Sequence, residues 1–542
     1  MSIATIACKA FDDQKPGTSG LRKQTRRFQE PGYLEAFVQS IFRVMPPSGP
    51  LVVGGDGRFF NAEAIQTILR IAAANGARQV IVGQDGLLST PAASHLVRHR
   101  KACGAIILSA SHNPAGPDGD FGVKFNTSNG APAPEELTGA VYEESRRIQA
   151  YSLFQGPDVD LSRPGRLQLG PMEVEVVDPA RDYADLMETL FDFDQIGTLL
   201  RRPGFSLLFD AMNAVTGPYA REILVRRLGA DPSCLVRAKP LTDFGHAHPD
   251  PTPANAPTLI EALRRAGGPS FGAASDGDGD RHMILGRDFH VNPSDSLAVL
   301  TANAELAPGY RGRMSGVARS MPTSRAVDVV ARALDIPVYE TPTGWKFFGS
   351  LLDAGSITLC GEESAGAGSD HVREKDGLWA VLFWLNLVAA RGLSVGEIVQ
   401  DHWGRFGRHA CQRHDYEGLS VDAAESLMSE LKASVRDMAG RRVAGLDVAA
   451  ADVFDYVDPV NSAVAKDQGV RIFLEGGGRA VFRLSGTGTS GATLRVYLEQ
   501  LVTDPAAMAR PAADLVAELG VFSREAARIL HFCDRQAPSA VV

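Results

Sequence analysis

The sequence predicts an α/β protein in which three related α/β segments are followed by a C-terminal α+β segment. Through the first three segments, short β-branched runs alternate with longer helical patterns. This alternation is typical of βαβ units built around a mostly parallel sheet. From residue 401 onward the pattern changes to alternating strands, such as 471–474 and 481–484, which predict a domain of a different kind.

The first segment shows the alternation most clearly. Its predicted elements, in order, are the strand 51–53, the helix 61–75, the strand 79–82, a helix through residue 99 and the strand 105–108. We expect Asn61 to cap the first helix and Gly76 to end it, because these residue types are favoured at those positions. Connections of this kind between parallel strands cross over with a right hand.

The same rhythm recurs in the next two segments. Its predicted elements are the strand 206–209, the helix 219–227, the strand 271–274, the helix 326–334, a strand at residue 338 and the strand 357–359. Each of the four segments has one polar loop at a strand end, which is the edge where open α/β sheets bind ligands. We predict domains at 1–178, 179–293, 294–400 and 401–542.

Composition and charge exclude several classes of protein. The chain has 55 Lys and Arg against 64 Asp and Glu, and the lack of a long basic stripe argues against a nucleic-acid partner. Its six cysteines lie far apart without a C-x-x-C pair, so neither a disulfide framework nor a zinc ribbon is expected. The apolar run 378–390 is too short to span a membrane, and the N-terminus lacks the apolar region of a signal peptide. We therefore expect a cytoplasmic protein without a nucleic-acid or membrane partner.

The first polar loop, at 109–114, directly follows the apolar strand 105–108. Ser, Asn and Pro are common turn residues, so an ordinary strand-to-helix turn is one interpretation. The other interpretation makes Ser111 a nucleophile or a phosphoryl carrier. A serine hydroxyl needs a base or a metal to activate it, and His112 and Lys124 are close in the sequence.

The second polar loop alternates Asp276, Asp278 and Asp280 with glycines between two strands. Three carboxylates this close repel one another unless a cation lies among them, and the glycines let the backbone bring them together. An all-oxygen set suits Mg²⁺ or Ca²⁺ rather than zinc, and Mg²⁺ is favoured because a few carboxylates and phosphate oxygens commonly hold it. An EF-hand is excluded because Arg281 and Arg287 stand where it needs Gly and Glu. A solvated acidic turn is the alternative.

The third loop holds Glu362, Glu363 and Ser364 at a strand end, with Lys375 behind it. Paired glutamates in such a place are usually solvated. A hydroxyl-rich substrate, however, needs hydrogen-bond acceptors of this type.

The fourth loop, at 486–491, matches the G-x-G-x-x-G pattern of dinucleotide-binding proteins. That pattern requires a helix after the loop, whereas residues 493–498 alternate like a strand, so we reject a dinucleotide site. What remains is a glycine-rich loop whose backbone N–H groups can hold an anion. Arg483 and Arg495 flank it, and their guanidinium groups suit a phosphate.

Taken together, these motifs resemble those of the phosphoglucomutases in the α-D-phosphohexomutase superfamily. The matching motifs are KPGTSGLRK (15–23), SASHNP (109–114), GDFGVKFN (119–126), DGDGDR (276–281), ETPTGWKFFG (340–349), CGEES (360–364), SDHVREKDGLWA (369–380) and RLSGTGTSGATLR (483–495). The resemblance spans essentially the whole chain, and the GEES form points to the glucose-preferring branch.

The resemblance implies three related domains with mixed α/β sheets and a C-terminal α+β domain, arranged around a central active-site cleft. It implies that Ser111 carries a phosphoryl group and that Mg²⁺ is held by Ser111, Asp276, Asp278 and Asp280. It also implies the interconversion of α-D-glucose 1-phosphate and D-glucose 6-phosphate, with glucose 1,6-bisphosphate as the intermediate.

Roles for individual residues follow from the same resemblance. The implied catalytic residues are Ser111, His112, Lys124, Lys375 and Arg22. The implied substrate-binding residues are Arg22, Arg281, Thr343, Gly344, Glu362, Ser364, Lys375, Arg483, Ser485, Gly486, Thr487 and Arg495. Two alternatives stay open: a broader, phosphomannomutase-like phosphohexomutase, and a catalytically silent relative, which should have lost Ser111 or an aspartate of the acidic loop.

Overall fold

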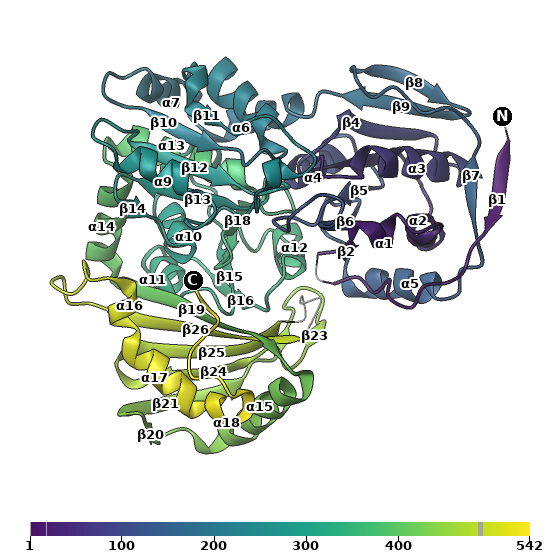
Figure 1. Ribbon diagram of the computed structural model, residues 1–542. Helices are drawn as coiled ribbons and strands as arrows, with labels where there is room; N and C mark the ends of the chain where they lie inside the picture. Colours follow the sequence, from purple (N-terminus) through teal and green to yellow (C-terminus); the bar gives the residue numbers. More distant parts are fainter. Residues whose placement is uncertain (1, 18, 486–490) are drawn as a thin grey trace.

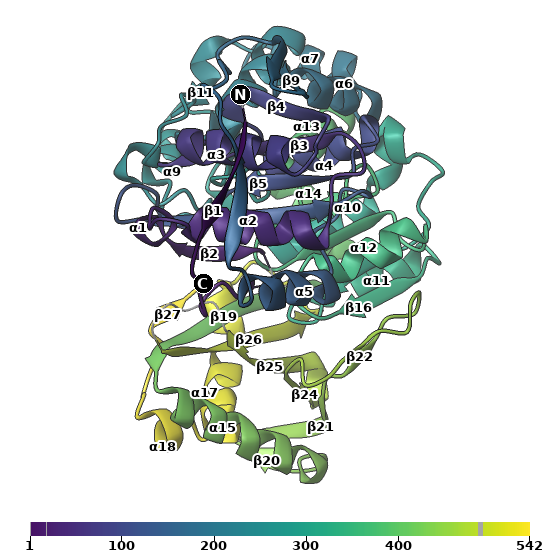
Figure 2. The same cartoon turned by 90° about the vertical axis from the view of Figure 1, so that its right-hand side faces the viewer.

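Four larger sheets, one after another along the chain, organise the part of the protein that the structure describes. The structure is a computed structural model, and it describes residues 2–17, 19–485 and 491–542. We refer to each sheet with its helices as domains I to IV, in chain order. Figures 1 and 2 show domain IV as a separate lobe below the other three. This is the predicted fold class.

Domain I contains a seven-stranded mixed sheet. Its strands, in spatial order, are β2 (Leu21–Gln24), β6 (Asp120–Thr127), β5 (Gly104–Leu108), β3 (Leu51–Gly55), β4 (Gln79–Leu87), β9 (Met172–Val177) and β8 (Gly165–Leu169). The four strands from β5 to β9 are parallel, and antiparallel strands close both edges. The helices are α2 (Tyr33–Val44), α3 (Asn61–Ala74), α4 (Thr90–His99) and α5 (Glu135–Ser145). Strand β6, which lies between the edge strand β2 and β5, is important below because it carries Lys124.

The predicted N-cap of α3 is wrong, whereas its predicted stop is confirmed. The cap position is occupied by Phe60, with φ at 74°, and Asn61 is already the first helical residue. The Asn61 amide donates to the carbonyl of Gly86 at 3.3 Å, so it joins two parts of the domain rather than capping the helix. Gly76 ends the helix with φ at 84°, a conformation that glycine adopts without steric cost.

Domains II and III repeat a parallel core with antiparallel strands at one edge only. In domain II the order is β11 (Leu235–Val236), β10 (Leu207–Asp210), β12 (Phe271–Ser275), β13 (His282–Gly286) and β14 (Phe289–His290). In domain III it is β16 (Val338–Thr341), β15 (Val317–Ser320), β17 (Leu359–Glu362) and β18 (Gly366–Ser369). The expected strand 357–359 is therefore displaced toward Glu362. The expected helix 219–227 is mostly a π-helical segment, Arg221–Arg227, after the short helix α8 (Thr216–Ala220).

One hydrophobic core cluster spans the first three domains, domain I has a second large cluster of its own, and domain IV has a separate core. The largest cluster of buried apolar residues runs from Val52 to Trp403 and includes most of α13 (Gly377–Arg391). Among the described residues no single helix has the length and apolar composition to cross a membrane. The pair α13 and α14 (Val395–Phe406) meets both criteria only together, with a bend of 82°.

Domain IV is built on an antiparallel sheet that follows α14 in the chain. The order is β20 (Arg442–Val443), β21 (Leu446–Val453), β24 (Val470–Leu474), β25 (Gly478–Ser485), β26 (Ala492–Val502), β19 (Arg408–Leu419) and β27 (Ala540–Val541). The helices α15 (Val421–Ser434) and α17 (Ala517–Ala526) supply apolar residues to its core. Strand β26, not a helix, follows the glycine-rich loop, as the alternation of residues 493–498 predicts.

Candidate active site

Loops of domains I, II and III meet at one place. The acidic loop after β12 is bonded to domain I through Thr90 N, which donates to the carbonyl of Asp278 at 2.9 Å. It is bonded to domain III through Gly377 N, which donates to the carbonyl of Gly279 at 3.0 Å. These backbone bonds bring together polar loops that lie far apart in the sequence, as the family resemblance implies.

Ser111 lies in this junction in an unusual backbone conformation. Its φ is 54°, which costs a residue other than glycine roughly 1–3 kcal/mol and requires support from the surroundings. Ser111 N donates to Ser109 Oγ at 2.7 Å, and the buried Arg58 donates to the Ser111 carbonyl at 2.7 Å. Arg58 is itself paired with buried Asp56 at 2.9 Å. These contacts direct the Ser111 side chain toward the acidic loop.

The acidic loop brings its three carboxylates together, as predicted. Among the residues that the structure describes, Asp276, Asp278 and Asp280 form the one group of three or more potential metal ligands whose ligand atoms all lie within 4.8 Å of one another. Asp276 Oδ1 accepts from the backbone N–H groups of Asp280 and Arg281 at 2.9 and 3.0 Å. A Cβ atom on Gly277 would lie 2.4 Å from the Ser111 carbonyl oxygen, so only glycine permits this approach.

Two observations show that the acidic loop fits a hard divalent cation. Asp278 Oδ1 and Asp280 Oδ1 are buried without a hydrogen-bond partner. Burial, with the charges of Asp280 and Asp278, raises the pKa of Asp276 well above its usual range. A cation among these oxygens would satisfy the unpaired atoms and offset the repulsion.

Ser111 and two lysines from different domains contact the aspartates of the acidic loop. Ser111 Oγ donates to Asp276 Oδ2 at 2.8 Å, and Lys124 Nζ donates to Asp278 Oδ2 at 2.5 Å. Lys375 Nζ lies 3.3 Å from Asp280 Oδ2. Burial opposes the charge of Lys124, but Asp278 and Asp280 offset it and raise the lysine pKa. Burial likewise opposes ionisation of Asp278, yet Lys124 lowers the pKa of that carboxyl.

Of the basic residues predicted for the site, His112 contacts Ser111, and Arg22, Arg281 and Lys375 act on His112 through their charges. His112 Nδ1 is 3.4 Å from Ser111 Oγ, and desolvation, with the nearby charges of Arg281 and Arg22, lowers the pKa of His112 well below its usual range. Burial also lowers the pKa of Arg22, against the opposing effect of Asp278. Sequence reasoning missed Asp250, whose carboxylate lies 3.4 Å from the guanidinium of Arg281.

The two glutamates of the third loop differ in their contacts. Glu362 is buried and accepts a hydrogen bond from Gly344 N at 2.9 Å, while its other oxygen lies 4.0 Å from Lys375 Nζ. Glu363 is instead bound by the hydroxyls of Ser320 and Thr323 at 2.9 and 3.2 Å. The hydroxyl of Thr343 is buried without a partner, and Ser364 is half-buried.

The strands that flank the fourth loop pair in a register that sets the two arginines side by side. Arg483 on β25 is directly opposite Arg495 on β26, and Ser485 is opposite Thr493. Arg483 donates to the carbonyl of Gln468 at 3.2 Å, and Arg495 lies 3.9 Å from Asp415. The predicted phosphate ligands Gly486 and Thr487 lie outside the described residues.

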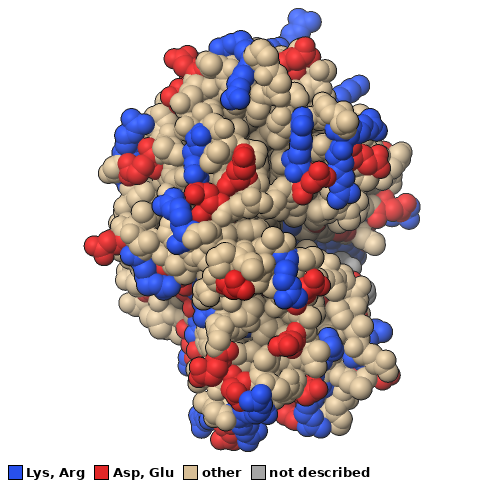
Figure 3. Space-filling view, turned by 90° about the vertical axis from the view of Figure 1, so that its left-hand side faces the viewer, with Lys and Arg blue, Asp and Glu red and all other residues tan. Residues whose placement is uncertain are grey.

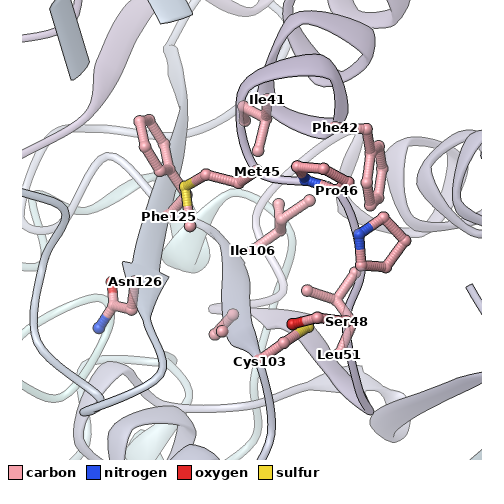
Figure 4. A pocket seen from close by; sticks show the side chains of 13 residues that line it. Ile41, Phe42, Met45, Pro46, Ser48, Leu51, Cys103, Ile106, Phe125 and Asn126 are labelled. Atoms are coloured by element: carbon pink, nitrogen blue, oxygen red, sulfur yellow. The ribbon is translucent and has the colours of Figure 1, made fainter. Parts of the chain in front are cut away.

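A separate cavity of about 220 Å³ lies in domain I, between α2, β5 and β6 (Figure 4). Its lining is largely apolar, with Ile41, Phe42, Met45, Ile106 and Phe125 among its residues. It does not include the acidic loop. The molecular face in Figure 3 shows basic and acidic side chains interspersed, without a continuous stripe of either sign.

Comparison with known proteins gives matches along nearly the whole chain. Family profiles described as phosphoglucomutase/phosphomannomutase alpha/beta/alpha domains I, II and III match residues 13–152, 181–288 and 293–406, and one described as the phosphoglucomutase-1 C-terminal domain matches residues 408–539. The chain is 54% identical over 506 residues to the phosphoglucomutase of Rhizobium radiobacter, which covers 93% of each chain. It is 47% identical over 561 residues to phosphoglucomutase-1 of Oryctolagus cuniculus, with 100% of both chains covered.

A solved structure agrees with these matches. The crystal structure of pp63/parafusin, a phosphoglucomutase from Paramecium in its open form, aligns with a TM-score of 0.93 at 44% identity, covering 100% of this chain and 99% of that one. The matches therefore include all four domains, in the same order along the chain. The chain therefore belongs to the phosphoglucomutase/phosphomannomutase family.

Proposed function

We propose that the protein is a phosphoglucomutase that interconverts α-D-glucose 1-phosphate and D-glucose 6-phosphate through a phosphoserine at Ser111. The observation that carries this proposal is the position of the Ser111 hydroxyl, which bonds Asp276 at 2.8 Å within a buried acidic loop. Lys124 and Lys375 approach the other two aspartates from different domains. A hydroxyl among carboxylates that fit a cation, with basic groups beside it, is suited to carrying a phosphoryl group.

The proposed reaction has two matching halves. In the first, the bond between phosphorus and Ser111 Oγ breaks, and a bond forms between phosphorus and the 6-hydroxyl oxygen of glucose 1-phosphate. The hydroxyl proton passes to a side chain of the site, and Ser111 Oγ takes up a proton as it leaves. Glucose 1,6-bisphosphate then turns around and returns its 1-phosphate to Ser111, which releases glucose 6-phosphate. We propose Lys124, Lys375 and His112 for the proton transfers.

The other groups of the site position the substrate. Ser111 and the three aspartates would hold Mg²⁺, which when bound supplies positive charge against the transferring phosphoryl group. We propose that the sugar hydroxyls bind Thr343, Gly344, Glu362 and Ser364. The phosphate that does not react would bind Arg483, Ser485, Gly486, Thr487 and Arg495, and Arg22 and Arg281 would contact phosphoryl oxygens. We thus propose hexose phosphates as the partners of the protein, and we propose no nucleic-acid partner.

The purified protein tests this function directly. With Mg²⁺ and a trace of glucose 1,6-bisphosphate, we expect it to convert glucose 1-phosphate to glucose 6-phosphate faster than it converts mannose 1-phosphate. Comparable rates would instead indicate the broader phosphohexomutase. Absence of turnover with both sugars would indicate a catalytically silent relative and contradict the proposal.

We also infer a cytoplasmic location. All six cysteines are free thiols, and Cys234 and Cys360 are buried. Free thiols are typical of a reducing compartment. Recovery of the protein with a membrane or secreted fraction would contradict this inference.

We expect Glu362→Gln to lower kcat/KM for both glucose phosphates by roughly 10- to 100-fold, since one charge-assisted hydrogen bond to a sugar hydroxyl is worth about 1.5–3 kcal/mol. The bisphosphate binds in two orientations, so the same residue must contact hydroxyls in both. Phosphorylation of Ser111 by the bisphosphate should stay detectable. Glu363→Gln is the matched control, because that carboxylate bonds Ser320 and Thr323, and its effect should be smaller. An effect on only one direction, beyond what the equilibrium requires, would disprove a shared sugar site.

We expect Arg483→Ala to lower kcat/KM by roughly 10- to 150-fold, because a charge-assisted bond to the non-reacting phosphate is lost. Part of the loss should appear in KM, since this contact forms on binding and persists through transfer. Exposed Arg442, which pairs with Asp447 elsewhere in domain IV, provides the control Arg442→Ala. Wild-type kcat/KM in Arg483→Ala at low substrate, or loss of its phosphoserine, would disprove the assignment.

A further inference from the structure

A buried carboxylate that the proposed reaction does not use lies beside Lys124. Glu374, in the loop before α13, is 4% exposed. Its Oε1 accepts from the amide of Asn126 at 2.9 Å, and this bond joins domain III to strand β6 of domain I. Phe125, the preceding residue on β6, packs into the hydrophobic core of domain I, so alternation along the strand places the Asn126 side chain on the opposite face. Glu374 therefore lies at the face of β6 opposite the one that packs into this core.

Lys124 shares that face of the strand with Asn126. Side chains two residues apart on a strand point the same way, and their Cα atoms are separated by roughly 7 Å. Lys124 and Glu374 also feel each other's charge: Glu374 helps to raise the pKa of Lys124, and Lys124 is the main charge that opposes the effect of burial on Glu374. Burial nevertheless raises the pKa of Glu374 to about 7.

The present partners of Lys124 are the oxygens that a cation would need. Lys124 Nζ lies 2.5 Å from Asp278 Oδ2 and 3.8 Å from Asp280 Oδ2. A divalent cation among the aspartates would repel the ammonium group and compete for the same oxygens. Lys124 is buried, and a buried ammonium group needs another acceptor when it loses its partner.

The second lysine of the site shows the same arrangement. Lys375 lies 3.3 Å from Asp280 and also has a carboxylate outside the acidic loop, Glu362, at 4.0 Å. Glu374 is the corresponding carboxylate for Lys124. The hydroxyl oxygen of Thr90 also accepts from Lys124 Nζ at 3.4 Å, and this hydroxyl donates its own hydrogen bond to Asp278. Thr90 is neutral, so it cannot replace a carboxylate as the partner of the ammonium group.

We propose that Glu374 is a positioning residue that takes up the Lys124 ammonium group when a divalent cation occupies Asp276, Asp278 and Asp280. The inference rests on the proposed function, which places a cation there. Without Glu374, Lys124 has no carboxylate to move to and competes with the cation. Glu374 thus acts on cation binding through Lys124, and Asn126 holds Glu374 in place.

Calorimetric titration of Mg²⁺ into the full-length protein tests this inference through a double-mutant cycle, which isolates coupling between two residues. We expect Glu374→Gln to raise the Kd for Mg²⁺ about tenfold. Lys124→Met should bind Mg²⁺ at least as tightly as the wild type, and Lys124→Met/Glu374→Gln should match Lys124→Met. The control is Glu35→Gln, since Glu35 is another desolvated acid, on α2 and away from the site, and its Kd should equal that of the wild type.

A second variant covers the case in which Glu374→Gln does not fold. Asn126→Ala keeps the charge of Glu374 but removes the hydrogen bond that holds it in place, so this variant should weaken Mg²⁺ binding less than Glu374→Gln does. In the Lys124→Met background, Asn126→Ala should not change the Kd. An unchanged Kd for Mg²⁺ in folded Glu374→Gln would overturn this inference but leave the proposed function standing. So would an equal loss with and without Lys124, because Glu374 would then act as a general negative charge. A wild-type protein that does not bind Mg²⁺ would overturn both this inference and the proposed cation.

Discussion

Ser111→Ala is expected to lower kcat by roughly 10⁴-fold or more, because the variant has no oxygen to carry the phosphoryl group between substrates. The other proposed groups, including the aspartates, would remain and could still bind the sugar phosphates. Alanine keeps the Cβ atom, so the strain at φ 54° is the same in both proteins. The loss of one hydroxyl that bonds Asp276 should change the free energy of unfolding by only about 1 kcal/mol.

Steady-state kinetics and a thermal melt on the same preparation separate these two effects. Ser128→Ala, at an exposed position of domain I, controls for the loss of a serine hydroxyl elsewhere and should keep wild-type kcat. A folded Ser111→Ala protein with substantial turnover would show that another residue carries the phosphoryl group.

Asp278→Asn is expected to weaken Mg²⁺ binding and to lower kcat by on the order of 100-fold or more, since losing even an indirect partner of a metal costs 10- to 100-fold. The substitution removes one of three charges available to the cation. It also removes the ion pair with Lys124, whose Nζ lies 2.5 Å from Asp278 Oδ2. A buried ammonium group without that partner should lower stability as well.

The activity of Asp278→Asn, measured across a range of Mg²⁺ concentrations, tests this prediction. Asp231→Asn is the matched control in domain II, because Asp231 caps a short helical turn and asparagine serves equally well at that position. If Asp278→Asn had the Mg²⁺ dependence of the wild type, the assignment of the acidic loop as the cation site would be wrong.

The parts of the site that could be predicted are those that local rules determine. Three aspartates that alternate with glycines predict a cation site, because carboxylates this close repel one another unless a cation lies among them. The strand-end rule places Ser111, the acidic loop and Glu362 each at a strand end of its own sheet, whereas only the family resemblance implied that the three loops meet in one cleft. Alternation along β25 puts Arg483 and Ser485 on one face of the sheet, although their partners on β26 come only from the observed register.

The residues that sequence reasoning missed act over long sequence separations. Arg58 donates a hydrogen bond to the backbone carbonyl of Ser111, which lies 53 positions along the chain. No spacing pattern in the sequence connects these two residues. Glu374 meets Asn126 across 248 positions, and its burial depends on how domains I and III pack. The wrong cap at Asn61 has a similar cause, since a contact with Gly86 overrides the local preference of asparagine for a cap.

The central claim is that Ser111 is the phosphoryl carrier, and the mass of the intact protein tests it most directly. After treatment with glucose 1,6-bisphosphate, the protein should gain the mass of one phosphoryl group, and peptide mapping should place it on Ser111. Addition of glucose 1-phosphate should remove that mass at a rate compatible with kcat, and Ser111→Ala should never acquire it. Turnover without the added mass, or with the group on a different residue, would contradict the account.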